Sequence, residues 1–249
     1  MRFTLTASTF VLLLSCFWAS CAQPPAMQSH AAPDMARHPP AAASGTPAMA
    51  PAPQFALAPT PAAALGTAPA GLGLHVGEEA PDARLADIAG GSHSLKALYG
   101  SGPTLVLFYR GGWCPFCNLQ LHEYSEAKGE FERRGVQIVA ISVDQPSQEA
   151  KTQARHGVPF LMLSDSRLDA HRAFRVVHVP GGDERDKLAG YGIDLAAYSG
   201  EMHGSFAVPA VFLIDRAGAV RFQHVDEDYK TRPSAAQMLA VVDRVFLAK

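Results

Sequence analysis

Two cysteines, Cys114 and Cys117, follow directly after an apolar run with two residues between them, and this arrangement constrains the fold more than any other feature of the chain. Residues 104–109 are predicted to form a buried strand, residues 111–112 a glycine turn, and the chain from Pro115 onward a helix. Both sulfurs would then lie in or beside the first helical turn. Unpaired N–H groups and the helix dipole favour thiolate there. The sequence therefore predicts a redox-active pair.

A structural zinc half-site or a pair of inert core thiols are the alternatives to a redox pair. Zinc takes about four ligands. Of the four cysteines, Cys16 and Cys21 remain as further sulfur ligands, and both lie near the N-terminus. The ten histidines show no paired ligand spacing. We therefore expect a redox pair that uses no metal and no cofactor.

The N-terminus has the pattern of an export signal over residues 1–21. Arg2 precedes an apolar stretch at 10–18, and small residues surround Cys21. The stretch is shorter than the about 20 residues that span a bilayer. Residues 18–21 resemble a bacterial lipobox, which would make the protein a lipoprotein tethered through acylated Cys21. A second candidate box ends at Cys16, and plain cleavage after Ala22 is the alternative. We expect an exported protein of the periplasm or cell envelope.

Composition separates a predicted linker from one folded domain. Residues 22–72 are rich in Ala and Pro and lack a periodic apolar face, which predicts a disordered linker. Residues 73–249 are predicted to fold as one domain. The formal net charge is −2 and the Lys and Arg residues are scattered. This distribution argues against a nucleic-acid partner.

Apolar strands alternate with helical patterns through the domain, which predicts an α/β fold with a central mixed sheet flanked by helices. A hairpin is expected around residues 90–91, and residues 181–204 read as polar and irregular. The other predicted strands are 104–109, 136–143, 160–163, 210–214 and 220–225, and the predicted helices are 117–134, 147–156, 167–174 and 233–247. A final hairpin and helix after two β/α units is the order of the thioredoxin fold.

In that fold a cis-proline faces the redox motif, so we expect a cis Val208–Pro209 bond, with an ordinary trans bond as the alternative.

Several stretches together resemble the AhpC/TSA redoxin family, in its peroxiredoxin-like branch with a Trp-Cys-Pro-x-Cys motif. The most specific is Phe-Tyr-Arg-Gly-Gly-Trp-Cys-Pro-Phe-Cys-Asn-Leu-Gln at residues 108–120. The weaker stretches follow in the same order as in the family, at 77–81, 163–165, 209–215 with Gly218, and 228–232.

The resemblance implies roles for the two sulfurs. Peroxiredoxins carry Pro-x-x-x-Thr/Ser-x-x-Cys, whose cysteine attacks the peroxide. In this chain Cys117 takes the attacking position, Cys114 replaces the hydroxyl residue and Arg110 replaces the proline. Cys114 would then form a disulfide with oxidised Cys117, and an external dithiol would reduce it. Thioredoxin-like exchange implies the reverse order, in which Cys114 attacks a partner disulfide and Cys117 resolves it.

Three further positions are candidates near the sulfurs. Arg110 could stabilise a thiolate or remain a surface arginine. Trp113 would cover the pair, and the backbone of Val208 with Pro209 would meet an extended substrate. We expect Asp228 and Arg232 to hold the last helix in place.

Three functions follow from these candidates. Hydroperoxide reduction is the leading hypothesis for this antioxidant-like site, and thiol-disulfide exchange with exported proteins is the second. Copper handling, with His122 or His203 beside the cysteines, is the third.

Overall fold

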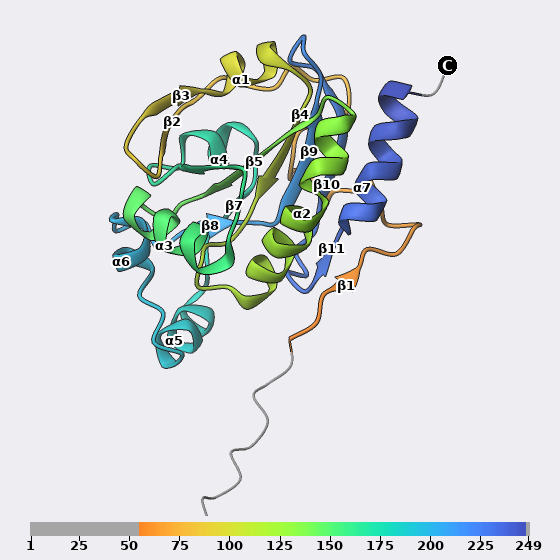
Figure 1. The fold of residues 1–249 in the computed structure, drawn as a ribbon. Coiled ribbons are helices and arrows are strands. Elements are labelled where there is room, and N and C mark those ends of the chain that lie inside the picture. The colour runs from red at the N-terminus through yellow and green to blue at the C-terminus, as the bar shows by residue number, and fades with distance from the viewer. Residues whose placement is uncertain (1–54, 248–249) are drawn as a thin grey trace, which may run out of the picture. The chain divides into compact units, whose positions relative to one another are not determined.

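The computed structural model describes residues 55–247 (Figure 1). The predicted export signal, the lipobox at Cys21 and the first part of the predicted linker lie outside the described residues. A seven-stranded mixed sheet has the order β10-β9-β4-β5-β6-β2-β3. Its strands are β2 (Arg84–Asp87), β3 (Ser92–Ser94), β4 (Thr104–Phe108), β5 (Gln137–Ser142), β6 (Leu161–Ser164), β9 (Ala210–Ile214) and β10 (Val220–Val225). Two small pairs are separate from it: β1 (Ala58–Pro59) with β11 (Thr231–Arg232), and β7 (Val177–His178) with β8 (Phe206–Ala207).

The central strand β4 is buried along its whole length, as the apolar run predicts. It pairs parallel with β5 and antiparallel with β9. Side chains alternate across a strand, so Leu105 and Leu107 enter the core on one face while Val106 and Phe108 enter the core on the other. The predicted α/β thioredoxin-like fold with a mixed sheet is confirmed.

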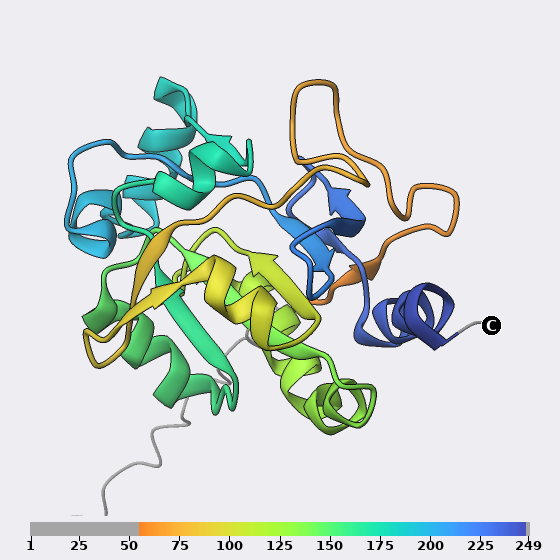
Figure 2. The same ribbon diagram turned by 90° about the horizontal axis from the view of Figure 1, so that it is seen from above.

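Helices cover both faces of the sheet (Figures 1 and 2). Residues from α2 and α7 join one core cluster, and residues from α1 and α4 join the other. No helix within residues 55–247 combines the length and apolarity needed to cross a membrane. The helices are α1 (Leu95–Ser101), α2 (Pro115–Arg133), α3 (Pro146–His156), α4 (Asp169–Ala173), α5 (Gly182–Gly190), α6 (Leu195–Ser199) and α7 (Ala235–Val242), which continues as a π-helical turn at Asp243–Leu247.

Two short helices, α5 and α6, occupy the region predicted to be irregular, so that prediction is wrong. Both views place them on the side of the molecule away from α7. The Asp194 side chain caps α6 by accepting hydrogen bonds from the N–H groups of Ala196 and Ala197. Local capping of this kind stabilises short helices without a long apolar stripe, so the hydrophobic pattern gave no signal.

Residues 55–72 are here called the N-terminal strap. The sequence predicted a disordered linker over 22–72, but the strap is part of the folded domain. β1 pairs in parallel with β11, with Pro59 opposite Arg232. Thr60 is buried and Leu65 packs against the core. Backbone pairing needs no periodic apolar side chains. The composition therefore gave no sign that the folded domain begins before residue 73.

The bond between Val208 and Pro209 is trans, like every other peptide bond within residues 55–247. The predicted cis bond is therefore wrong. The backbone of Val208 is already engaged, since its N–H donates to the carbonyl of Val176 at 2.7 Å. The Pro209 carbonyl accepts from the N–H of Asp226 at 3.2 Å.

Candidate active site

The turn between β4 and α2 presents both cysteines at the start of a helix, as predicted. Cys114 is the N-cap of α2, and Pro115 takes the first helical position, where a missing N–H costs nothing. Gly111 has a φ of 144°, a conformation that residues with a Cβ rarely adopt. The Cys114 N–H donates to the Gly111 carbonyl at 3.1 Å and closes the turn.

Cys114 and Cys117 are free thiols, and they are only 1% and 0% exposed. Burial alone would raise the pKa of Cys117, but the hydrogen bond from Cys114 and the charge of Arg232 lower it to about 6. The same hydrogen bond raises the pKa of Cys114 well above its ordinary value, and burial adds to this effect. The two pKa values therefore move apart, which makes Cys117 the thiolate and Cys114 the thiol that donates to it.

Arg232 contacts the Cys117 sulfur, a role that sequence reasoning missed. Its Nη2 lies 3.7 Å from Cys117 Sγ, and the residue is 2% exposed. Its Nε and Nη1 have no hydrogen-bond partner within residues 55–247. The strap supports this position, because the Thr60 N–H donates to the Arg232 carbonyl at 2.9 Å. A separation of 115 residues along the chain concealed the contact.

The Arg110 side chain is directed mainly into an aromatic cluster. Its guanidinium forms an ion pair with Glu184 at 3.0 Å. Three rings lie 4.3–4.8 Å from its Cζ, those of Trp113, Phe206 and Tyr229. The backbone of Arg110 hydrogen-bonds to Cys117, which lowers the pKa of that thiol more than the guanidinium charge of Arg110 does.

A small pocket of about 60 Å³ brings several predicted residues together. Arg110, Val208, Pro209 and Tyr229 are among its lining residues. Trp113 does not line it and instead packs edge-on against Phe206, with 5.3 Å between ring centroids. One water molecule occupies about 30 Å³ of the liquid, so the pocket has room for a very small molecule.

Two buried carboxyl groups behind the motif were not among the predicted site residues. Asp144 Oδ2 accepts a hydrogen bond from the Gly112 N–H at 2.7 Å. Burial raises the pKa of Asp144 to about 7, and the charge of Cys117 adds to the shift. Glu149 accepts hydrogen bonds from Ser142 Oγ at 2.6 Å and from the Tyr109 hydroxyl. An acidic residue just past a buried strand was the available signal, because such residues collect at one sheet edge.

The Asp144→Asn variant is expected to stabilise the reduced protein at alkaline pH. The raised pKa of Asp144 means that the folded state keeps a proton which the unfolded state releases. The wild-type free energy of unfolding therefore decreases as the pH rises from about 4 to about 7. Asparagine does not titrate, so urea unfolding should show a gain of about 1–3 kcal/mol at about pH 8 and little gain at about pH 5. The same gain at both values, or a pH-dependent gain in the exposed control Asp183→Asn, would contradict this account.

The Gly112→Ala variant is expected to destabilise the fold, because Gly112 packs directly on α3. A Cβ at this position would lie 1.9 Å from Thr152 Oγ1 and 3.1 Å from Thr152 Cβ. Overpacking of this kind costs about 1–3 kcal/mol. Thermal unfolding of Gly112→Ala, alone and combined with Thr152→Ala, would measure the cost. Additive losses in the double variant, in place of partial rescue, would disprove the contact.

The histidines proposed for copper binding do not approach the sulfurs. His203 Nε2 lies 2.8 Å from the Ser166 carbonyl, and its Nδ1 accepts from the Ser205 N–H at 2.9 Å. His122 is exposed on α2. Within residues 55–247 no three His, Cys, Asp or Glu side chains gather as a metal site.

Comparisons with known proteins point to a single family. The model of the AhpC/TSA family matches residues 76–223. Thiol-disulfide oxidoreductase ResA of Halalkalibacterium halodurans is 29% identical over 105 residues, which cover 42% of this chain and 58% of ResA. The chloroplastic peroxiredoxin Q of Populus jackii is 32% identical over 92 residues, covering 37% of this chain and 43% of that protein. The chain thus spans less than two thirds of the length of either relative.

Among solved structures, peroxidoxin BcpB of Mycobacterium tuberculosis superposes with a TM-score of 0.53. The two share 19% sequence identity, and the match covers 70% of this chain and 98% of BcpB. This likeness concerns the fold.

Proposed function

The chain belongs to the AhpC/TSA family, and from this membership we propose that it reduces hydroperoxides with Cys117 as the attacking thiol. Membership of this family identifies the protein as a thiol-based enzyme of the peroxiredoxin or thiol-disulfide oxidoreductase type. The observation that carries the proposal is the pair of donors on Cys117 Sγ, namely the Cys114 thiol and Arg232. They favour thiolate at the sulfur that would meet the peroxide.

The proposed cycle uses both cysteines. The Cys117 thiolate attacks one peroxide oxygen, the O–O bond breaks, and the other oxygen takes a proton and leaves as water or an alcohol. Cys117 becomes a sulfenic acid. The Cys114 sulfur then attacks Cys117, water leaves, and a disulfide forms. An external dithiol reduces that disulfide and supplies two electrons.

The burial of both sulfurs favours a peroxide over a protein disulfide as the oxidant. A protein disulfide must bring a bulky chain to a sulfur that is at most 1% exposed. A peroxide needs much less space, and the pocket of about 60 Å³ at Arg110 and Pro209 suits a molecule of the size of hydrogen peroxide. We therefore propose that the peroxide approaches Cys117 by way of this pocket, whose lining includes Arg110 but neither sulfur.

Thiol-disulfide exchange is the second candidate, supported by the similarity to ResA over 105 residues. It would start at Cys114, whose raised pKa makes it the weaker nucleophile at neutral pH. Copper handling is not supported, because neither His122 nor His203 joins the two cysteines in a metal site within the described residues. Export and a tether through Cys21 remain predictions of the sequence and lie outside the described residues.

The test is the rate at which hydrogen peroxide oxidises the reduced protein in stopped flow, with insulin reduction assayed in parallel. We expect oxidation far faster than that of free cysteine and weak insulin reduction. A peroxide rate equal to that of free cysteine, with strong insulin reduction, would replace this proposal by disulfide exchange.

A further inference from the structure

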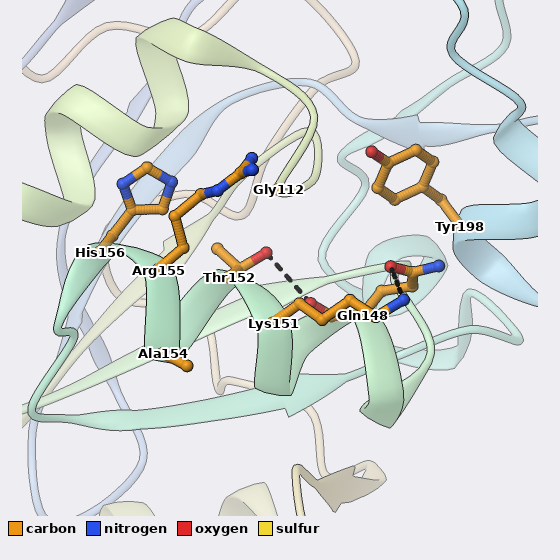
Figure 3. A pocket seen from close by; sticks show the side chains of 8 residues that line it. All are labelled: Gly112, Gln148, Lys151, Thr152, Ala154, Arg155, His156 and Tyr198. Atoms are coloured by element: carbon orange, nitrogen blue, oxygen red, sulfur yellow. Dashed lines mark hydrogen bonds between the residues drawn. The ribbon is translucent and has the colours of Figure 1, made fainter. Parts of the chain in front are cut away.

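A second and larger pocket lies between α3 and α6 and reaches residues 111–114, here called the redox loop, at Gly112 (Figure 3). Its volume is about 630 Å³, within the usual range for small-molecule sites. Tyr198 of α6 stands opposite the α3 side chains. The two walls are tied together, since the Gln145 N–H donates to the Tyr198 carbonyl at 2.8 Å. The remaining lining residues are Gly112, Gln148, Lys151, Thr152, Ala154, Arg155 and His156.

The walls of this pocket combine apolar surface with polar side chains and two positive charges. Lys151 and Arg155 are exposed, and neither forms a salt bridge within residues 55–247. His156 adds a buried Nε2 without a hydrogen-bond partner among the described residues. None of the lining residues is acidic. Such walls suit a molecule with an anionic group, and a guanidinium is well suited to a carboxylate.

The pocket reaches the redox loop at Gly112. The Gly112 carbonyl accepts from Asn118 Nδ2 at 2.9 Å, which holds it against the first turn of α2. Figure 3 shows the Arg155 side chain extending toward Gly112. Cys114 follows Gly112 by two residues. A molecule held here therefore lies beside the loop that carries the first cysteine.

We propose that this pocket binds the carboxylate of a small thiol reductant, through Arg155 and Lys151, and directs its sulfur to the Cys114–Cys117 disulfide. The proposal rests on the disulfide formed in the proposed function and deepens it by naming the class of reductant. The reductant is a carboxylate-bearing dithiol or two molecules of a carboxylate-bearing monothiol.

The chemistry of the disulfide favours attack at Cys114. The reductant thiolate forms a bond with Cys114 Sγ, the Cys114–Cys117 bond breaks, and Cys117 leaves as a thiolate. The thiol with the lower pKa leaves faster, and that thiol is Cys117. The second thiolate of the reductant then attacks the sulfur bound to Cys114. Cys114 is released and takes up a proton, and the reductant ends as a disulfide.

The test compares dihydrolipoate with dihydrolipoamide, which carry the same dithiol but differ in one negative charge. The protein is first oxidised to its disulfide with diamide, so no peroxide chemistry is involved and failure of the peroxidase proposal would not affect the result. Second-order rate constants for reduction are then measured by thiol trapping. The proteins are the wild type, the double variant Lys151→Gln with Arg155→Gln, and the control Lys96→Gln, an exposed lysine on α1.

We expect the wild type to react about tenfold faster with dihydrolipoate, and the double variant to lose that preference. Its rate with dihydrolipoamide should stay within about twofold of the wild-type rate, because that reductant does not use the cations. Lys96→Gln should behave as the wild type. Equal wild-type rates with the two reductants, no reaction with either, or an equal slowing of both in the double variant would overturn the proposal.

Discussion

The Cys117→Ser variant is expected to lose reaction with hydrogen peroxide by a factor of at least about 10³, as is usual when a nucleophile is removed. A serine hydroxyl stays protonated where the Cys117 thiol has a pKa of about 6. The remaining Cys114 is not expected to substitute for it, because burial still raises the pKa of its thiol when the Cys117 sulfur is absent. Stopped-flow oxidation of the reduced variant, followed by tryptophan fluorescence, measures the loss.

The Cys114→Ser variant is the matched control for Cys117→Ser. Its serine hydroxyl can still donate a hydrogen bond to Cys117, so the first oxidation should remain fast. Turnover should stop afterwards, because no second sulfur is present to form the disulfide, and the sulfenic acid should accumulate and be trapped by dimedone. Fast oxidation of Cys117→Ser together with an unreactive Cys114→Ser would assign the attack to Cys114 and support the thioredoxin order.

The parts of the fold that the sequence predicted well are those whose signal is local. The strand predicted at 104–109, the Gly111–Gly112 turn and the helix from Pro115 each have a distinct pattern; the strand is observed at Thr104–Phe108, and the turn and helix are confirmed. The hairpin at residues 90–91 is confirmed as the β2–β3 pair. The strap was missed because its order comes from backbone pairing with β11, far along the chain. α5 and α6 were missed because they are short, and α6 is capped by the local Asp194 side chain and not marked by a long apolar stripe.

The site shows the same division between local and long-range signals. The two cysteines and their position at a helix start could be read from a spacing of three residues. Arg232 and Asp144 could not, because their roles depend on which distant segments meet at Cys117 and Gly112. Arg110 was read from its closeness in sequence, yet its charge is largely engaged by Glu184 and the aromatic rings. Closeness along the chain therefore pointed to Arg110, whereas the guanidinium that contacts the Cys117 sulfur is that of Arg232.

The Arg232→Met variant is expected to raise the pKa of Cys117 and move the pH dependence of peroxide reaction to higher values. In the wild type the thiolate is present above about pH 6 and is lost as the pH falls through this value. Removing the positive charge 3.7 Å from the sulfur takes away one cause of the low pKa. At about pH 6 the variant should react at least about fivefold more slowly, since loss of a neighbouring opposite charge raises a pKa by about 1 or more. The thiolate absorbance and the oxidation rate, each measured as a function of pH, give the two curves.

The form of the pH profile distinguishes an electrostatic role of Arg232 from a structural one. If Arg232 acts through its charge, the Arg232→Met rate should approach the wild-type rate near pH 9, where an ordinary cysteine also ionises. Arg232→Lys should fall between the two, because it keeps the charge but not the fixed guanidinium geometry. Arg221→Gln, an exposed arginine on β10, should leave the profile unchanged. An Arg232→Met rate lowered by the same factor at every pH, with the thiolate curve unmoved, would mean that Arg232 supports β11 and does not tune the Cys117 thiol.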